Sequence, residues 1–254
     1  MSHLRTFAKL MHVLSPAMMT RFILVYTGRV KSATIQTKDG VKIFIRGDRQ
    51  GENQAFVDIF VHETYTRGDF ALGAEMTIVD IGAQVGLFSL YASVHATKAR
   101  IFAFEPVKDN FLVLQKNVRL NRMKRIVPVM QAVSKSTGHA KIFIHPTHTA
   151  AHSMFQQRVV PEAKAMSIQT ISLADAFVKH NIDVVDFLKI DCQGAEYDIL
   201  FTAPDDTISK IKKIAMEYHD LDKLRNGKVM QRFLKKKGFQ VRSSEEGMLF
   251  AWRT

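Results

Sequence analysis

The stretch from residue 77 to residue 90 has the spacing that most clearly points to chemistry. It reads TIVDIGAQVGLFSL, in which one acid, Asp80, lies in an apolar run and is followed by Gly82 and Gly86. This order predicts a strand, a tight turn and a helix. Gly82 can adopt backbone angles closed to other residues, and Gly86 leaves the first helical turn without a side chain. We expect unpaired amides of this corner to face the carboxylate or phosphate of a nucleotide cofactor.

A second acid, Glu105, follows the apolar segment 102–104 and precedes Pro106. Because proline ends a strand, the Glu105 carboxylate is expected to face a cleft at the strand end. A carboxylate in this place can accept hydrogen bonds from both ribose hydroxyls, so Glu105 predicts a bound nucleoside. The same acid would serve NAD, and a surface acid beside a helix is the plainer alternative.

Strand and helix patterns alternate after this corner. The segments occupy residues 99–104, 109–121, 126–133, 139–145, 167–172, 173–180, 184–191, 195–203, 211–219 and 222–237. This rhythm predicts a largely parallel sheet with helices on both faces. Residues 239–243 and 247–252 predict an antiparallel hairpin that completes the sheet, and residues 147–166 predict a long loop.

An extension is expected to precede the main domain. We place the extension at residues 1–50, with a basic helix and a hairpin over 33–45, and the main domain at residues 51–254. The longest uncharged run near the start, residues 10–20, contains Pro16 and is too short to span a membrane.

The first 38 residues contain six lysines or arginines and no acid. On a helical wheel Phe7 and Met11 share one face, and Arg5 and Lys9 share another. A helix that packs on the domain, a membrane-surface anchor and an organelle-import sequence all fit this pattern. Peripheral membrane contact through residues 1–30 therefore stays open beside a cytoplasmic location.

The overall charge is strongly positive, +12 with an isoelectric point near 9.8. Such a chain suits an anionic neighbour such as nucleic acid, anionic lipid or a phosphorylated substrate, although a solvated basic surface is the favoured explanation of the charge. Cys192 is the only cysteine, which excludes an intrachain disulfide and a cysteine-rich zinc site.

The glycine spacing distinguishes between cofactors. Dinucleotide sites usually carry G-x-G-x-x-G, whereas residues 80–86 read DIGAQVG. This corner resembles the D-x-G-x-x-x-G turn of class I S-adenosylmethionine-dependent methyltransferases. Together with EPVKDNF at residues 105–111 and DFLKIDCQGAE at residues 186–196, it makes the chain similar to the FkbM-family methyltransferases over roughly residues 55–220 in one collinear order.

The resemblance implies a fold, a cofactor and an acceptor. The fold is the class I (Rossmann-like) α/β fold with a mixed seven-stranded sheet, the cofactor is S-adenosylmethionine, and the acceptor is a hydroxyl on a sugar, glycolipid or similar small metabolite. The residues implied to bind the cofactor are Asp80, Gly82, Ala83, Gln84, Gly86, Glu105, Asn110, Ala132 and Asp191. Two positions depart from the family, because Gln84 replaces a common Asn and Gln193 replaces a common Glu.

Methyl transfer to an alcohol requires a proton acceptor, and two side chains at expected strand ends are candidates. Asp191 ends an apolar segment, and His219 ends another, two residues after Glu217. We hypothesise that Asp191 lies near the methyl group, with Glu217 or His219 assisting. Support of the cofactor or a helix cap is the alternative role for Asp191, and an ordinary loop histidine is the alternative for His219.

Three histidines cluster in the long loop, His145, His148 and His152, and imidazole nitrogens are common metal ligands. No carboxylate nearby in the sequence completes a set of metal ligands. We therefore expect no metal and a loop that closes over the acceptor. The acceptor is expected to be a small molecule, glycan or lipid, with an anionic group left open. Nucleic acid is not favoured, and RNA or protein methylation and a non-catalytic assembly role remain as alternatives.

Overall fold

The computed structural model describes residues 2–47, 51–244 and 247–253, with side chains from residue 5 onward. The boundary expected at residue 50 and the hairpin connection at residues 245–246 lie outside these residues. Within the described part of the chain, no helix is both long and apolar enough to cross a membrane.

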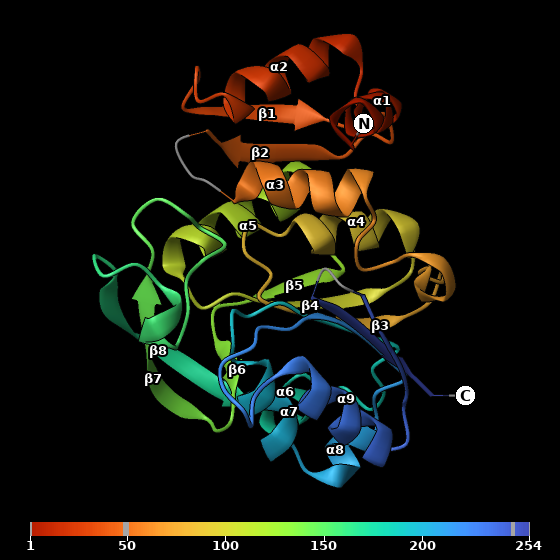
Figure 1. The fold of residues 1–254 in the computed structure, drawn as a ribbon. Coiled ribbons are helices and arrows are strands. Elements are labelled where there is room, and N and C mark those ends of the chain that lie inside the picture. Colours follow the sequence, from red (N-terminus) through yellow and green to blue (C-terminus); the bar gives the residue numbers. More distant parts are fainter. Residues whose placement is uncertain (1, 48–50, 245–246, 254) are drawn as a thin grey trace.

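A seven-stranded mixed sheet forms the centre of the molecule, as expected (Figure 1). Its strands, in spatial order, are β11 (Gln240–Ser243), β12 (Met248–Trp252), β10 (Lys213–Glu217), β9 (Phe187–Ile190), β3 (Thr77–Ile81), β4 (Arg100–Phe104) and β5 (Ile126–Val129). The strands from β10 to β5 are parallel, and the β11–β12 hairpin pairs antiparallel to β10. All four residues of β9 are buried, as helices on both faces require.

Helices cover both faces of this sheet (Figure 1). One face carries α3 (Glu52–Phe56), a π-helical turn η1 (Val57–Val61), α4 (Leu87–His95) and α5 (Lys108–Leu120). The other face carries α6 (Leu173–Lys179), α7 (Glu196–Thr202), α8 (Asp205–Ser209) and α9 (Gly227–Lys236). Short 3-10 turns lie at η2 (Gly68–Phe70) and η3 (Gln156–Arg158). The helix expected from residue 222 begins later because Asn226 caps it and accepts the Val229 amide.

A second, three-stranded sheet lies beside the first and corrects one expectation. The segment 126–133, expected as one strand, contains β5 and the separate β6 (Ala132–Ser134). β6 pairs with β8 (Lys164–Ser172), which also pairs with β7 (Gly138–Ile144). Because β8 begins at Lys164, the loop expected to end at residue 166 is shorter.

The N-terminal segment forms a layer over α3 to α5 (Figure 1). It consists of α1 (Ser2–Val13), α2 (Pro16–Tyr26) and the hairpin of β1 (Ser32–Gln36) and β2 (Lys42–Arg46). Asn117 of α5 and Asn121, the residue just after α5, accept hydrogen bonds from backbone amides of β2. These bonds attach the hairpin to the domain. The N-terminal extension is therefore attached to α5, one of the helices that cover the sheet.

Helix α1 packs on the domain through a different face from the one that Phe7 and Met11 share. Leu10 and Leu14 are buried, whereas Phe7 and Met11 remain 47% and 51% exposed. The helix therefore packs on the domain while Arg5 and Lys9 on it stay exposed, and membrane contact through residues 1–30 stays a prediction.

Candidate active site

A cavity of about 290 Å³ opens at the carboxyl ends of β3, β4 and β9. Gly82, Glu105 and Asp191 each follow one of these strands directly, so parallel pairing brings them to one edge of the sheet. The wall also contains apolar groups suited to a purine, namely Ile81, Phe104, Ala132, Val133 and Ile142. This edge is where open α/β sheets bind ligands.

The two glycines of the corner are required by close contacts. Gly82 has φ +74°, and a Cβ on it would lie 1.8 Å from the carbonyl oxygen of Asp191. Gly86 has φ +88° as the residue before α4, and a Cβ there would lie 2.3 Å from Leu114 Cδ1. Both positions combine a left-handed backbone with no room for a side chain.

The expectation of unpaired amides at this corner is wrong for four residues. The amides of Gly82 and Ala83 donate to the carbonyl of Phe104, and the Gly86 amide donates to Ala83. The Gln84 amide donates to Glu105 Oε2 at 2.9 Å. The corner therefore positions the end of β4 and its carboxylate instead of offering these amides to a ligand.

Glu105 is the buried acceptor of the cavity, with only 5% of its surface exposed. Its two oxygens accept one amide each, from Gln84 and from Val107. Burial raises the pKa of Glu105 to about 7, although these amide bonds oppose the rise. The Asn110 side chain also hydrogen-bonds to this carboxylate. Two carboxylate oxygens have about four lone-pair sites, so acceptor capacity remains for a ribose hydroxyl.

The pKa of Glu105 predicts a pH-dependent affinity for the nucleoside. Because the charged carboxylate is the better acceptor and becomes protonated below pH 7, we expect the Kd for S-adenosylmethionine to rise about tenfold from pH 8 to pH 6. Isothermal titration calorimetry at several pH values measures this dependence. Glu105→Gln should bind weakly with a flat profile, and an unchanged slope in that variant would assign the titration to another group.

A buried ion pair lies beneath the corner and was not predicted. Lys189 of β9 lies 3.2 Å from Asp80 Oδ1, and both side chains are almost fully buried. Lys189 also donates to the carbonyl of Gly82 at 2.8 Å, and Ser89 donates to Asp80 Oδ2 at 2.7 Å. A lone lysine within the apolar run FLKI was the only signal for this role.

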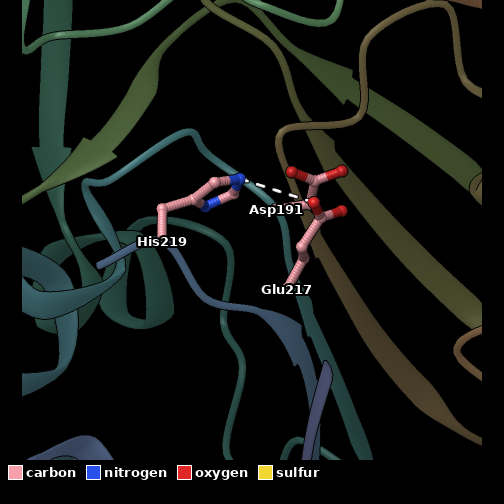
Figure 2. A group of neighbouring side chains, drawn as sticks. All are labelled: Asp191, Glu217 and His219. Carbon is pink, nitrogen blue, oxygen red and sulfur yellow. Dashed lines mark ion pairs between the residues drawn. The ribbon is translucent and has the colours of Figure 1, made fainter. Parts of the chain in front are cut away.

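Asp191, Glu217 and His219 meet at one end of the cavity, with their polar atoms within 4.8 Å of one another (Figure 2). The Tyr65 hydroxyl donates to Asp191 Oδ2 at 3.0 Å. His219 Nε2 lies 3.5 Å from Glu217 Oε1. Three such groups could hold a proton or a cation, and among the described residues this is the one group with metal-ligand spacing.

Glu196 orients His219 and was not among the expected site residues. It is fully buried, and its Oε1 accepts both the backbone amide and Nδ1 of His219, at 2.7 and 3.0 Å. Its Oε2 accepts the Gly194 amide. Burial alone would lower the pKa of His219, but the bonds to Glu196 and Glu217 outweigh it and raise that pKa to about 9.

Most predicted site residues line the cavity. They are Gly82, Ala83, Gln84, Glu105, Asn110, Ala132, Asp191 and Glu217. Asp80 and Gly86 instead lie behind the corner, and His219 lies behind Glu217.

The long loop covers the cofactor cavity. Gln84 Nε2 donates to Thr149 Oγ1, and Asn110 Nδ2 donates to the Thr149 carbonyl. His148 and His152 line the cavity, whereas His145 Nδ1 accepts the His148 amide. The loop therefore lies over the cavity beside Gln84 and Asn110, and the expected closure over an acceptor stays a prediction.

A second, open groove of about 810 Å³ adjoins this cavity. The two share three wall residues, Asp58, Tyr65 and Glu217. The rest of the groove is formed by α1 and the segment after η1, through Arg5, Thr6, Lys9, His62, Thr64 and Arg67, and by Met248. The N-terminal layer thus contributes directly to a site.

The chain is similar to known methyltransferases and to part of a larger synthetase. AmbE, the AMB antimetabolite synthetase of Pseudomonas aeruginosa, is 24% identical over 76% of this chain, which spans only 11% of that protein. The 31-O-demethyl-FK506 methyltransferase FkbM of Streptomyces tacrolimicus is 25% identical over 68% of this chain and 76% of its own length. The solved methyltransferase FkbM of Methylobacillus flagellatus shares the fold, with a TM-score of 0.52 and 19% identity over 79% of this chain and 53% of that one.

A family model described as the methyltransferase FkbM domain matches residues 80–241. This range contains the glycine corner, the strand that ends at Glu105, and the Asp191 and Glu217 strand ends. It extends over well more than half of the chain. The chain therefore belongs to the FkbM family of methyltransferases, which confirms the expected class I fold and S-adenosylmethionine as cofactor.

Proposed function

We propose that this protein transfers a methyl group from S-adenosylmethionine to a hydroxyl of a small acceptor such as a saccharide. The observation that carries the proposal is the shared wall of Asp58, Tyr65 and Glu217 between the cofactor cavity and the open groove. The hydroxyl of Tyr65, one of these shared residues, donates a hydrogen bond to Asp191. A donor and an acceptor in the two spaces would therefore meet beside a carboxylate.

The residues of the cavity fit the proposed donor. Glu105 would accept the ribose hydroxyls, and the apolar wall formed by Ile81, Phe104 and Ile142 would contact the base. Asp191 and Glu217 place negative charge near the junction, which suits a cationic sulfonium group. When bound, S-adenosylmethionine supplies an activated methyl group, and the protein's part is to position the acceptor and remove its proton.

Asp191 is the proposed general base. It lines the cofactor cavity next to Tyr65 of the junction, and Tyr65 and Gln193 hydrogen-bond to its two oxygens and fix its orientation. His219 is less suited to this role because a pKa of about 9 keeps it protonated at neutral pH. We assign His219 to holding Glu217 in place and balancing the two carboxylates.

Turnover is expected to be insensitive to metal removal. The raised pKa of His219 opposes metal binding, because a proton must leave the ring before one of its nitrogens, which face Glu196 and Glu217, can bind a metal. We expect incubation with EDTA at pH 7.5 to leave the initial rate unchanged. Loss of activity that added Mg²⁺ or Mn²⁺ restores would instead assign Asp191, Glu217 and His219 to a metal site.

The proposed activity is tested by incubating the protein with methyl-labelled S-adenosylmethionine and fractionated cell extract. We expect label in a small-molecule or saccharide fraction, in line with the 31-O-demethyl-FK506 methyltransferase, whose name places its reaction on a small molecule. Mild alkaline hydrolysis removes methyl esters and leaves methyl ethers, so resistance of the label excludes transfer to a carboxylate. Label confined to RNA or protein would contradict the proposal.

A further inference from the structure

The open groove has one basic wall, supplied by α1 and by the segment after η1. Arg5 and Lys9 are four residues apart and therefore lie on the same side of α1. Arg67 lines the same groove, and its Nε donates to the carbonyl of His62 at 2.8 Å. All three side chains are exposed to solvent. The groove thus presents three cations to whatever enters it.

The cations of α1 are not neutralised by the protein. Among the residues that the structure describes, no carboxylate lies within 4.0 Å of Arg5 or Lys9, although eight other ion pairs occur there. The surrounding segment, residues 1–38, contains no acid. Its positive potential therefore remains available to a ligand.

The part of the groove that is shared with the cofactor cavity contains two carboxyl groups. Asp58 and Glu217 line both the groove and the cofactor cavity, whereas Arg5, Lys9 and Arg67 line the groove alone. Burial raises the pKa of Asp58, and the charges of Glu217 and Asp191 contribute to that rise. An anionic group would be repelled at this junction and attracted to the basic wall. The charge distribution therefore favours one orientation of a bound acceptor, with its anionic group at the basic wall.

We infer that the groove selects acceptors that carry a carboxylate or phosphate, which Arg5, Lys9 and Arg67 bind while a neutral hydroxyl of the same molecule reaches Asp191. This inference rests on the proposed methyl transfer and adds the acceptor's chemical class. Arginine and lysine both bind such groups, arginine in a bidentate way. The acceptor is therefore a hydroxylated acid or a phosphorylated hydroxyl compound.

The test uses the labelling reaction with methyl-labelled S-adenosylmethionine and cell extract that anion exchange has separated into retained and unretained compounds. We expect label in the retained fraction. Solvent partition of that fraction with chloroform and methanol then separates an anionic lipid from a water-soluble acid or phosphate, since both contain the inferred group.

A charge-reversed variant, Arg5→Glu with Lys9→Glu, should lower kcat/KM for the retained fraction by about tenfold or more. Arg29→Glu with Lys31→Glu is the matched control, because it changes the net charge equally from exposed positions outside the groove and should keep the rate. Arg5→Lys with Lys9→Arg preserves both charges and should remain active. Calorimetry should give all three variants the wild-type Kd for S-adenosylmethionine, which shows that they are folded.

The failures of the two proposals are distinguishable. Label only in the unretained, neutral fraction would overturn the anionic acceptor and leave methyl transfer standing. An equal loss of kcat/KM in the control variant would overturn the role of Arg5 and Lys9, because only general charge would matter. Absence of label from every fraction, with S-adenosylmethionine still bound, would overturn methyl transfer and this inference with it.

Discussion

Asp191→Asn is expected to lower kcat by about 10² to 10⁴-fold, the usual contribution of a positioned general base. The substitution keeps the size of the side chain and can still accept the Tyr65 hydroxyl, but it removes the group that takes the acceptor's proton. Affinity for S-adenosylmethionine should fall less than kcat, because the proposed ribose contact at Glu105 and the nearby Glu217 carboxylate both remain. Steady-state rates on the labelled acceptor, combined with calorimetry, measure the two effects separately.

Asp186→Asn provides the matched control for this prediction. Asp186 lies immediately before β9, at the opposite end of the same strand, where it bonds Lys212 and the Thr77 amide. It should keep the wild-type kcat. Full turnover by Asp191→Asn would remove Asp191 as the base and leave Glu217 as the remaining carboxylate of the cluster.

Lys189→Met is expected to reduce the free energy of unfolding by about 3 to 5 kcal/mol, because it leaves the buried charge of Asp80 without a partner. Lys189 and Asp80 have side-chain exposures of 4% and 0%, so water cannot replace the lost partner. The variant also loses the bond to the Gly82 carbonyl, which should weaken cofactor binding. Urea unfolding followed by circular dichroism measures the stability.

Two further variants separate charge burial from general damage to the core. Lys189→Met combined with Asp80→Asn removes both charges and should recover much of the lost stability. Lys212→Met breaks the exposed pair with Asp186 and should cost at most about 1 kcal/mol. A loss below about 1 kcal/mol in Lys189→Met alone would contradict the importance of the buried pair.

The parts of the fold that could be predicted depend on local patterns. The order of Asp80, Gly82 and Gly86 is readable in one segment, and it identified a strand, a turn and a helix that the structure contains. Apolar runs that end at Glu105 and Asp191 likewise mark strand ends, and parallel pairing places both at one edge. Family resemblance supplied the cofactor, which spacing alone did not distinguish from NAD.

The parts that could not be predicted depend on distant contacts. The Gly82 amide bonds the carbonyl of Phe104, and Lys189 pairs with Asp80 across more than a hundred residues, so neither contact leaves a local pattern. The break between β5 and β6 follows from the pairing of β6 with β8, which begins thirty residues after the end of β6. The groove requires α1 to lie beside η1, and helical periodicity gives no information on that contact.

Glu105 has one further consequence for how the donor associates. Two main-chain amides hold its carboxylate before any nucleoside arrives, so its rotamer freedom is lost during folding and not at the moment of binding. Calorimetry should therefore show little entropic penalty from this side chain. Crystals grown with and without the donor should superimpose at Glu105, in the manner of a preorganised receptor.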